Sequence, residues 1–154
     1  MPLFARLVFG LVNFAARKGL AAPGHAPSAK SRARQTGIRG ETFAYWYLRR
    51  HGYIFIARNF TAPGIKGEID LIGYDGPALV FVEVKTRAGD SADFARPEDA
   101  VTPDKRRALV RMARQFLLER RIREAPCRFD VLAIESRPGR PPLVRLHKGA
   151  FTAG

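Results

Sequence analysis

Apolar residues follow two different spacings along the chain, and together they predict an α/β domain. Alternating or continuous apolar runs bounded by turn residues are typical of strands. Such runs lie at 53–59, in both halves of 67–87, at 128–134 and at 143–147. Apolar positions three and four residues apart predict helices instead. These helices are expected from Thr36 to about His51 and from Thr102 to about Arg121.

The hairpin expected within residues 67–87 carries charged side chains where a buried strand needs none. Because side chains alternate along a strand, Glu83 and Lys85 share a face with the apolar Phe81. Asp70 interrupts the preceding strand. Two carboxylates ~4 Å apart repel by roughly 4 kcal/mol at an effective dielectric of 20. A divalent cation with oxygen ligands removes this repulsion, so Asp70 and Glu83 are candidate ligands of Mg²⁺ or Mn²⁺.

Lys85 would lie beside such an ion, where it could orient or deprotonate a water or neutralise charge on a phosphate. The alternative is that Asp70 is a turn residue and that Glu83 and Lys85 form a solvated pair on a sheet edge. Asp130 in the fourth strand is expected to pair with a nearby arginine rather than to join the site.

The first helix adds a third acid to this set. Glu41 falls on the helical stripe of Gly37, Ala44 and Leu48, and an acid on the apolar side of a helix needs a partner. A metal ion shared with Asp70 and Glu83 is one such partner. A structural salt bridge to Lys85 or to an arginine is the other.

The charge balance indicates a polyanionic partner. The chain has 27 Lys and Arg against 14 Asp and Glu, a net charge of +13, which favours nucleic acid or an anionic membrane surface. The single cysteine, Cys127, excludes a disulfide framework and fits a reducing, cytoplasmic compartment. We expect its thiol to be buried at the start of a strand. The candidate phosphate contacts are Arg39, Arg58, Lys66, Arg87, Lys105 and Arg106.

Residues 1–36 differ from the rest because no acid occurs before Glu41. Helical spacing in Leu3–Ala16 predicts a short amphipathic helix, too short to span a bilayer, so no transmembrane segment is expected. Residues 21–35 are typical of a linker. The segment could be a nucleic-acid-binding arm, a membrane-surface helix or a poorly ordered extension. We therefore expect a basic extension at 1–36 and one folded domain at 37–151.

Several segments, taken in order, carry a resemblance to a known family. They are Gly40-Glu41, Arg58-Asn59-Phe60, Gly67-Glu68-Ile69-Asp70-Leu71-Ile72, Phe81-Val82-Glu83-Val84-Lys85-Thr86-Arg87, the 105–117 helix and Arg128-Phe129-Asp130-Val131. Over about residues 37–151 the chain resembles the YraN family of bacterial proteins, described as predicted endonucleases. The resemblance implies the restriction-endonuclease-like fold, a mixed central sheet flanked by helices.

The acidic set also resembles the PD-(D/E)xK nuclease site, although Ile69 stands where that motif has proline. It is similar to the site of archaeal Holliday-junction resolvases, and by that likeness Glu41, Asp70, Glu83 and Lys85 are the expected catalytic residues. The implied activity is metal-dependent endonucleolytic cleavage of DNA, on branched or other structured substrates. A homodimer would suit a junction-cutting enzyme. The alternative is a non-catalytic nucleic-acid-binding or recombination accessory module with the same fold.

Overall fold

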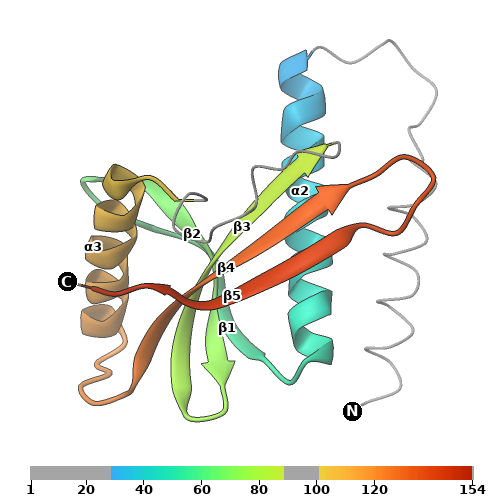
Figure 1. Ribbon diagram of the computed structural model, residues 1–154. Coiled ribbons are helices and arrows are strands. Elements are labelled where there is room, and N and C mark those ends of the chain that lie inside the picture. Colours follow the sequence, from blue (N-terminus) through green and yellow to red (C-terminus); the bar gives the residue numbers. More distant parts are fainter. Residues whose placement is uncertain (1–28, 89–100, 154) are drawn as a thin grey trace.

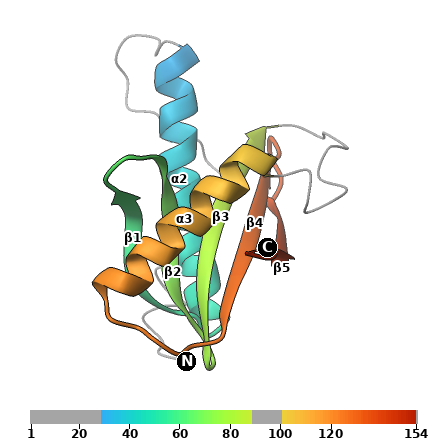
Figure 2. The same ribbon diagram turned by 90° about the vertical axis from the view of Figure 1, so that its left-hand side faces the viewer.

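The computed structural model describes residues 29–88 and 101–153, which form a five-stranded sheet with one helix on each face (Figure 1; Figure 2). The strands are β1 (Ile54–Ala62), β2 (Ile65–Asp75), β3 (Ala78–Ala88), β4 (Cys127–Ser136) and β5 (Leu143–Phe151). The helices are α2 (Ala29–Arg50) and α3 (Pro103–Glu119). The strands lie in sequence order, and only β3 and β4 are parallel. The expected α/β class is confirmed, and this mixed sheet is consistent with a restriction-endonuclease-like fold.

Each face of the sheet buries a separate apolar layer under its helix. The α3 layer contains Met112 and Phe116 packed with Phe81 of β3. The α2 layer contains Leu48 packed with Val82 of β3. Alternate residues of β3 therefore enter opposite layers, as the alternation of side chains along a strand requires. The expected face of β3, which begins in a core and ends in Glu83 and Lys85, is confirmed.

Alternation along β2 breaks at Asp70. Ile69 and Leu71 are two residues apart and would normally point to the same face. Ile69 instead packs in the α3 layer and Leu71 in the α2 layer. The strand therefore changes face between them, at Asp70.

The neighbouring strand changes face at the matching position. On β1, Phe60 packs in the α3 layer, whereas the guanidinium of Arg58 lies 4.8 Å from the ring centre of Tyr45 on α2. Asn59, between them, has a φ of 48°, the left-handed region that asparagine tolerates better than most residues. Because Arg58 pairs with Leu71 and Phe60 with Ile69, Asn59 lies opposite Asp70. At this one level of the sheet, groups from both faces can meet.

A network of ion pairs links the β2–β3 turn to strands β4 and β5. Arg128 contacts Asp75 at 2.6 Å and Asp130 at 2.7 Å, and Lys148 contacts Asp75 at 2.7 Å. The Tyr53 hydroxyl donates to Asp130 at 3.2 Å. Burial raises the pKa of Tyr53, so its hydroxyl stays protonated as a donor. The expectation that Asp130 pairs with an arginine is confirmed.

Some element boundaries differ from those predicted by the sequence. Helix α2 begins at Ala29 rather than at Thr36, because residues 29–35 contain no glycine or proline to stop a helix. The thiol of Cys127 is exposed and donates to the carbonyl of Ala125, so the expectation of a buried thiol is wrong. The helix predicted at Leu3–Ala16 lies outside the described residues. Within the described ranges, neither helix combines the length and apolar character needed to cross a membrane.

We expect Gly40→Ala to destabilise the protein by about 1–3 kcal/mol, because overpacking forces neighbouring groups apart. A Cβ at Gly40 would overlap the Thr86 hydroxyl of β3 and lie 3.2 Å from the Thr86 Cβ. Gly37→Ala is the matched control, since nothing lies within 4 Å of a Cβ there. The control should be neutral or gain up to about 1 kcal/mol from helix propensity. Urea denaturation measures both, and equal midpoints for the two variants would contradict the close approach of α2 to β3.

Candidate metal centre

Three carboxylates gather at the level where β1 and β2 change face. Glu41 of α2 and Glu68 and Asp70 of β2 each place an oxygen within 4.8 Å of the others. The pairing of β2 with β3 runs from Asp75 and Ala78 to Leu71 and Val82. One step further along that register, Asp70 faces Glu83. Glu83 therefore lies beside the three clustered acids but is not part of the set whose oxygens are within 4.8 Å of one another. We refer to Glu41, Glu68, Asp70 and Glu83 together as the acidic group.

Asp70 lies at the centre of this group and is 7% exposed. Its Oδ2 accepts a hydrogen bond from the backbone N–H of Val84 at 2.7 Å. Burial, and then the charge of Glu83, raise the pKa of Asp70 to about 7. Glu41 raises this pKa further, while the Val84 hydrogen bond and Lys105 oppose the rise. The site therefore holds one carboxyl that ionises with difficulty unless more positive charge arrives.

Glu83 has one satisfied oxygen and one unsatisfied oxygen. Its Oε1 lies 3.0 Å from Nζ of Lys85 and 3.5 Å from Nζ of Lys105. Its Oε2 is buried and has no hydrogen-bond partner among the described residues. Buried polar atoms nearly always have a partner, and an exception calls for an explanation such as a missing ion. A cation beside Glu83 Oε2 would supply that partner.

Groups from both faces of the sheet hold the acids in place. Asn59 of β1 donates from Nδ2 to Glu41 Oε2 at 3.0 Å. On the other face, Lys105 in the first turn of α3 reaches Glu83 and also donates to the carbonyl of Glu68 at 3.4 Å. The α3 turn is itself fixed, because Thr102 caps it by accepting from the Lys105 backbone N–H.

This set of donors fits a hard divalent cation. Mg²⁺ and Mn²⁺ prefer carboxylate and water oxygens, and a cation would offset the repulsion among Asp70, Glu83 and Glu41. Asp70 differs from Asp75 of the ion network in the direction of its pKa shift. Lys148 and Arg128 lower the pKa of Asp75 below the usual range, whereas the pKa of Asp70 is raised. The acidic group that includes Asp70 and Glu83 is therefore not one more internally neutralised salt-bridge cluster.

The structure brings all four residues predicted to be catalytic to one end of the sheet. Glu41, Asp70 and Glu83 belong to the acidic group, and Lys85 contacts Glu83 with its side chain 37% exposed. Sequence reasoning missed Glu68, although its spacing of two from Asp70 on a strand was a usable signal.

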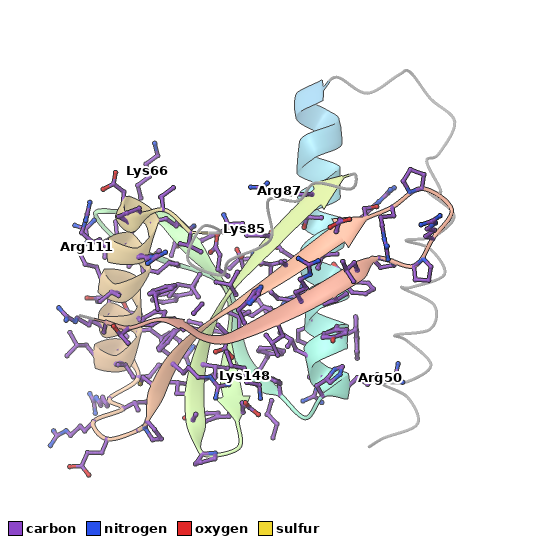
Figure 3. The ribbon with its side chains drawn as sticks, in the orientation of Figure 1. Arg50, Lys66, Lys85, Arg87, Arg111 and Lys148 are labelled. Atoms are coloured by element: carbon purple, nitrogen blue, oxygen red, sulfur yellow. The ribbon has the colours of Figure 1, made fainter. Side chains whose placement is uncertain are left out.

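The six predicted phosphate contacts fall in different surroundings. Lys105 lies in the acidic group rather than on the outer surface. Arg106 donates to the carbonyl of Val101 and lies over the ring of Phe151, so it also packs the fold. The remaining four, all exposed, are Arg39, Arg58, Lys66 and Arg87. Figure 3 shows Lys66, Lys85 and Arg87 toward one end of the molecule, and Lys148 and Arg50 toward the other.

Replacing Asp70 by Asn should stabilise the metal-free protein at neutral pH. The folded-state pKa of Asp70 is about 7, above the ordinary 3.8, so folding favours the protonated form. The stability that wild type has below pH 4 is therefore lost as pH rises toward 7 and above. The advantage of Asp70→Asn in free energy of unfolding should grow over that window to on the order of 1–4 kcal/mol. Denaturant titrations in EDTA at several pH values measure it.

Asp75→Asn is the matched control with the opposite sign. The Asp75 pKa is lowered by Lys148 and Arg128, so its ionised form stabilises the fold. This variant should lose stability at neutral pH, and the loss should shrink as pH falls below the ordinary carboxyl pKa. If the stability changes of Asp70→Asn and Asp75→Asn vary with pH in the same direction, the raised pKa of Asp70 is wrong.

Comparison with known sequences gives the family. The sequence model of the uncharacterised protein family UPF0102 matches residues 40–134, more than half of the 154-residue chain. A UPF0102 protein of Koribacter versatilis is 44% identical over 118 residues, which are 76% of this chain and 79% of that protein. One of Symbiobacterium thermophilum is 44% identical over 121 residues, covering 79% of this chain and 99% of that protein. The matched region contains Glu41, Asp70, Glu83 and Lys85. The resemblance to the YraN family is confirmed, and the chain belongs to the UPF0102 family.

Proposed function

We propose that this protein is a nuclease that hydrolyses phosphodiester bonds of DNA and depends on Mg²⁺ or Mn²⁺. The observation that carries the proposal is the buried Oε2 of Glu83, which has no partner in the described part of the chain and lies beside Asp70, whose pKa is raised. A carboxylate pair in this condition supports binding of a hard cation. The family resemblance supports the reaction class, and the net charge of +13 supports a polyanionic substrate.

In this proposal the acids bind the metal ion, and Lys85 and Lys105 offset the negative charge that the ion leaves uncompensated. Asp70 and Glu83 would be ligands, with Glu41 and Glu68 contributing directly or through water. A bound divalent ion would polarise the phosphodiester and lower the pKa of an attacking water. Lys85 contacts Glu83 and is partly exposed, so its ammonium can meet a water or a phosphate oxygen. It would orient the nucleophile and offset the charge that builds on phosphorus-bound oxygens.

Lys105 has a different role in the proposal because it is less exposed and has two acceptors. Its Nζ reaches Glu83 Oε1 and the Glu68 carbonyl. It therefore joins α3 to the ends of β2 and β3. We assign it to fixing the orientation of the Glu83 carboxylate through Oε1, which leaves Oε2 without a partner among the described residues.

Basic residues of α3 offer a surface for the backbone of the substrate. A hollow of about 750 Å³ is lined by four arginines and one acid of α3 together with the chain after β5, namely Arg106, Arg107, Arg111, Arg114 and Asp104. Figure 3 shows Arg111 directed outward from α3. Guanidinium groups along a helix suit phosphate contacts that carry no sequence information. This surface supports nucleic-acid binding whether or not the protein is catalytic.

Lys85→Ala and Asp70→Ala should lower Mg²⁺- or Mn²⁺-dependent cleavage of DNA by roughly 10²–10³-fold, the usual loss when one transition-state contact is removed. The assay compares branched, flapped and single-stranded DNA, with the same strands as RNA. Glu124→Gln, in the exposed connection before β4, is the control for a change of surface charge and should keep full activity. A Lys85→Ala or Asp70→Ala protein as active as wild type refutes the proposal.

If wild type binds DNA tightly but shows no heat of metal binding in calorimetry, the non-catalytic module is the correct interpretation.

Arg111→Gln combined with Arg114→Gln should weaken DNA binding and flatten its salt dependence. Each phosphate contact contributes about 0.9 to the slope of log affinity against log salt, so the double variant should lose up to about 2. Arg50→Gln with Arg123→Gln removes the same charge from exposed positions outside the α3 hollow and is the matched control. Fluorescence anisotropy between ~50 and 200 mM salt measures the slopes. Equal slopes for both double variants would remove α3 from the binding surface.

A further inference from the structure

A second, smaller cavity lies on the α2 side of the sheet and has a basic lining. Its volume is about 130 Å³, room for roughly four waters at about 30 Å³ each. Its polar lining comes from three arginines and two hydroxyl residues on α2, β3, the end of β4 and the β4–β5 connection. They are Arg39, Thr86, Ser136, Arg137 and Arg140. No Asp or Glu of the described residues lines it.

Arg137 contributes to this lining a buried donor that has no acceptor within the described residues. Its Nη2 donates to the carbonyl of Pro141 at 3.3 Å. Its Nε is buried and has no acceptor among the described residues. A guanidinium is always charged and its donors form a rigid fork, so a buried Nε–H without a partner is costly. An anion in the cavity would supply the missing acceptor.

The cavity adjoins the candidate metal centre along two elements. On α2, Gly40 lines the cavity and the next residue is Glu41. On β3, Thr86 lines the cavity and the preceding residue is Lys85. Neighbouring residues of a strand are about 3.3 Å apart and point to opposite faces. The cavity therefore lies next to the acidic group but on the α2 side of β3.

We propose that this cavity is a phosphate-binding pocket that takes one phosphate group of the strand bound at the metal centre. The inference rests on the proposed function for the origin of the phosphate, but the anion site is argued from the cavity alone. Guanidinium forks and hydroxyls match the oxygens of a phosphate and pair with it in charge-assisted hydrogen bonds. The volume suits one such group with part of its sugar, and it is too small for a base pair.

Two sources share this chemistry. An internal phosphodiester carries one negative charge, whereas a terminal monoester carries about −1.5 to −2 at neutral pH. Binding of either kind of phosphate in this pocket would place the neighbouring nucleotide beside the acidic group. It would thereby fix which bond lies beside Lys85.

The first test measures the anion site without metal or catalysis. Inorganic phosphate is titrated into wild type in EDTA and binding is followed by calorimetry and ³¹P NMR. Arg137→Gln with Arg140→Gln should weaken phosphate binding roughly tenfold or more, the usual loss for charged hydrogen bonds. Arg50→Gln with Arg123→Gln, which loses equal charge outside the pocket, should bind as wild type does. Circular dichroism checks folding, and Arg137→Lys, which keeps the charge but removes the Nε donor, should bind less well than wild type.

The second test identifies the source of the phosphate, using cleavage of strands that end in a 5′-phosphate, a 3′-phosphate or only hydroxyls. If the Arg137→Gln, Arg140→Gln protein shows a raised KM with little change in kcat for one terminal phosphate alone, the pocket takes that end. If KM rises for all strands, the pocket takes an internal phosphodiester. Unchanged phosphate binding in this variant overturns the proposal. If wild type binds phosphate but cleaves no strand, and the double variant binds phosphate less well, the nuclease proposal fails and the anion site stands.

Discussion

Electrostatic repulsion among buried carboxylates is the constraint on which the functional part of this structure depends. Asp70 and Glu83 are almost fully buried, and Glu41 and Glu68 lie beside them. Without compensation such a group raises its own pKa values, as Asp70 does, or weakens the fold. Among the described residues, Lys85 and Lys105 contact one oxygen of Glu83, and its other oxygen has no hydrogen-bond partner. A bound cation would relieve this imbalance, and the proposed metal-dependent function rests on it.

The break in alternation at Asn59 and Asp70 is what brings these groups together. In a regular sheet, a residue on α2 and a residue on α3 would be separated by the backbone of the strands. Here β1 and β2 change face at the same level, so Glu41 approaches from one side and Lys105 from the other. The left-handed conformation of Asn59 belongs to this change, and its side chain also holds Glu41. Local backbone irregularity therefore carries a positional function.

Sequence reasoning predicted those features of the fold that depend on residues close together in the chain. The strand faces around Phe81 and Glu83, the helix start at Thr102 and the apolar stripe of Glu41's helix all follow from spacing within a few residues. The place of Lys105 could not be predicted, because the approach of α3 to Glu83 joins residues 22 apart in the chain. Glu68 was within reach of the spacing argument but was overlooked. The small basic cavity forms because the β4–β5 connection meets α2, which no local pattern encodes.

The ion network around Asp75, Arg128 and Asp130 has a consequence for how this domain can change over time. It fastens the β2–β3 turn to β4 and β5 with paired charges, remote along the strands from the acidic group. The ion pairs thus lie at one end of the hairpin and the candidate metal centre lies at the other. Substitutions among the acids of the candidate centre would leave these ion pairs intact. Residues at the candidate site can therefore vary while the sheet stays assembled.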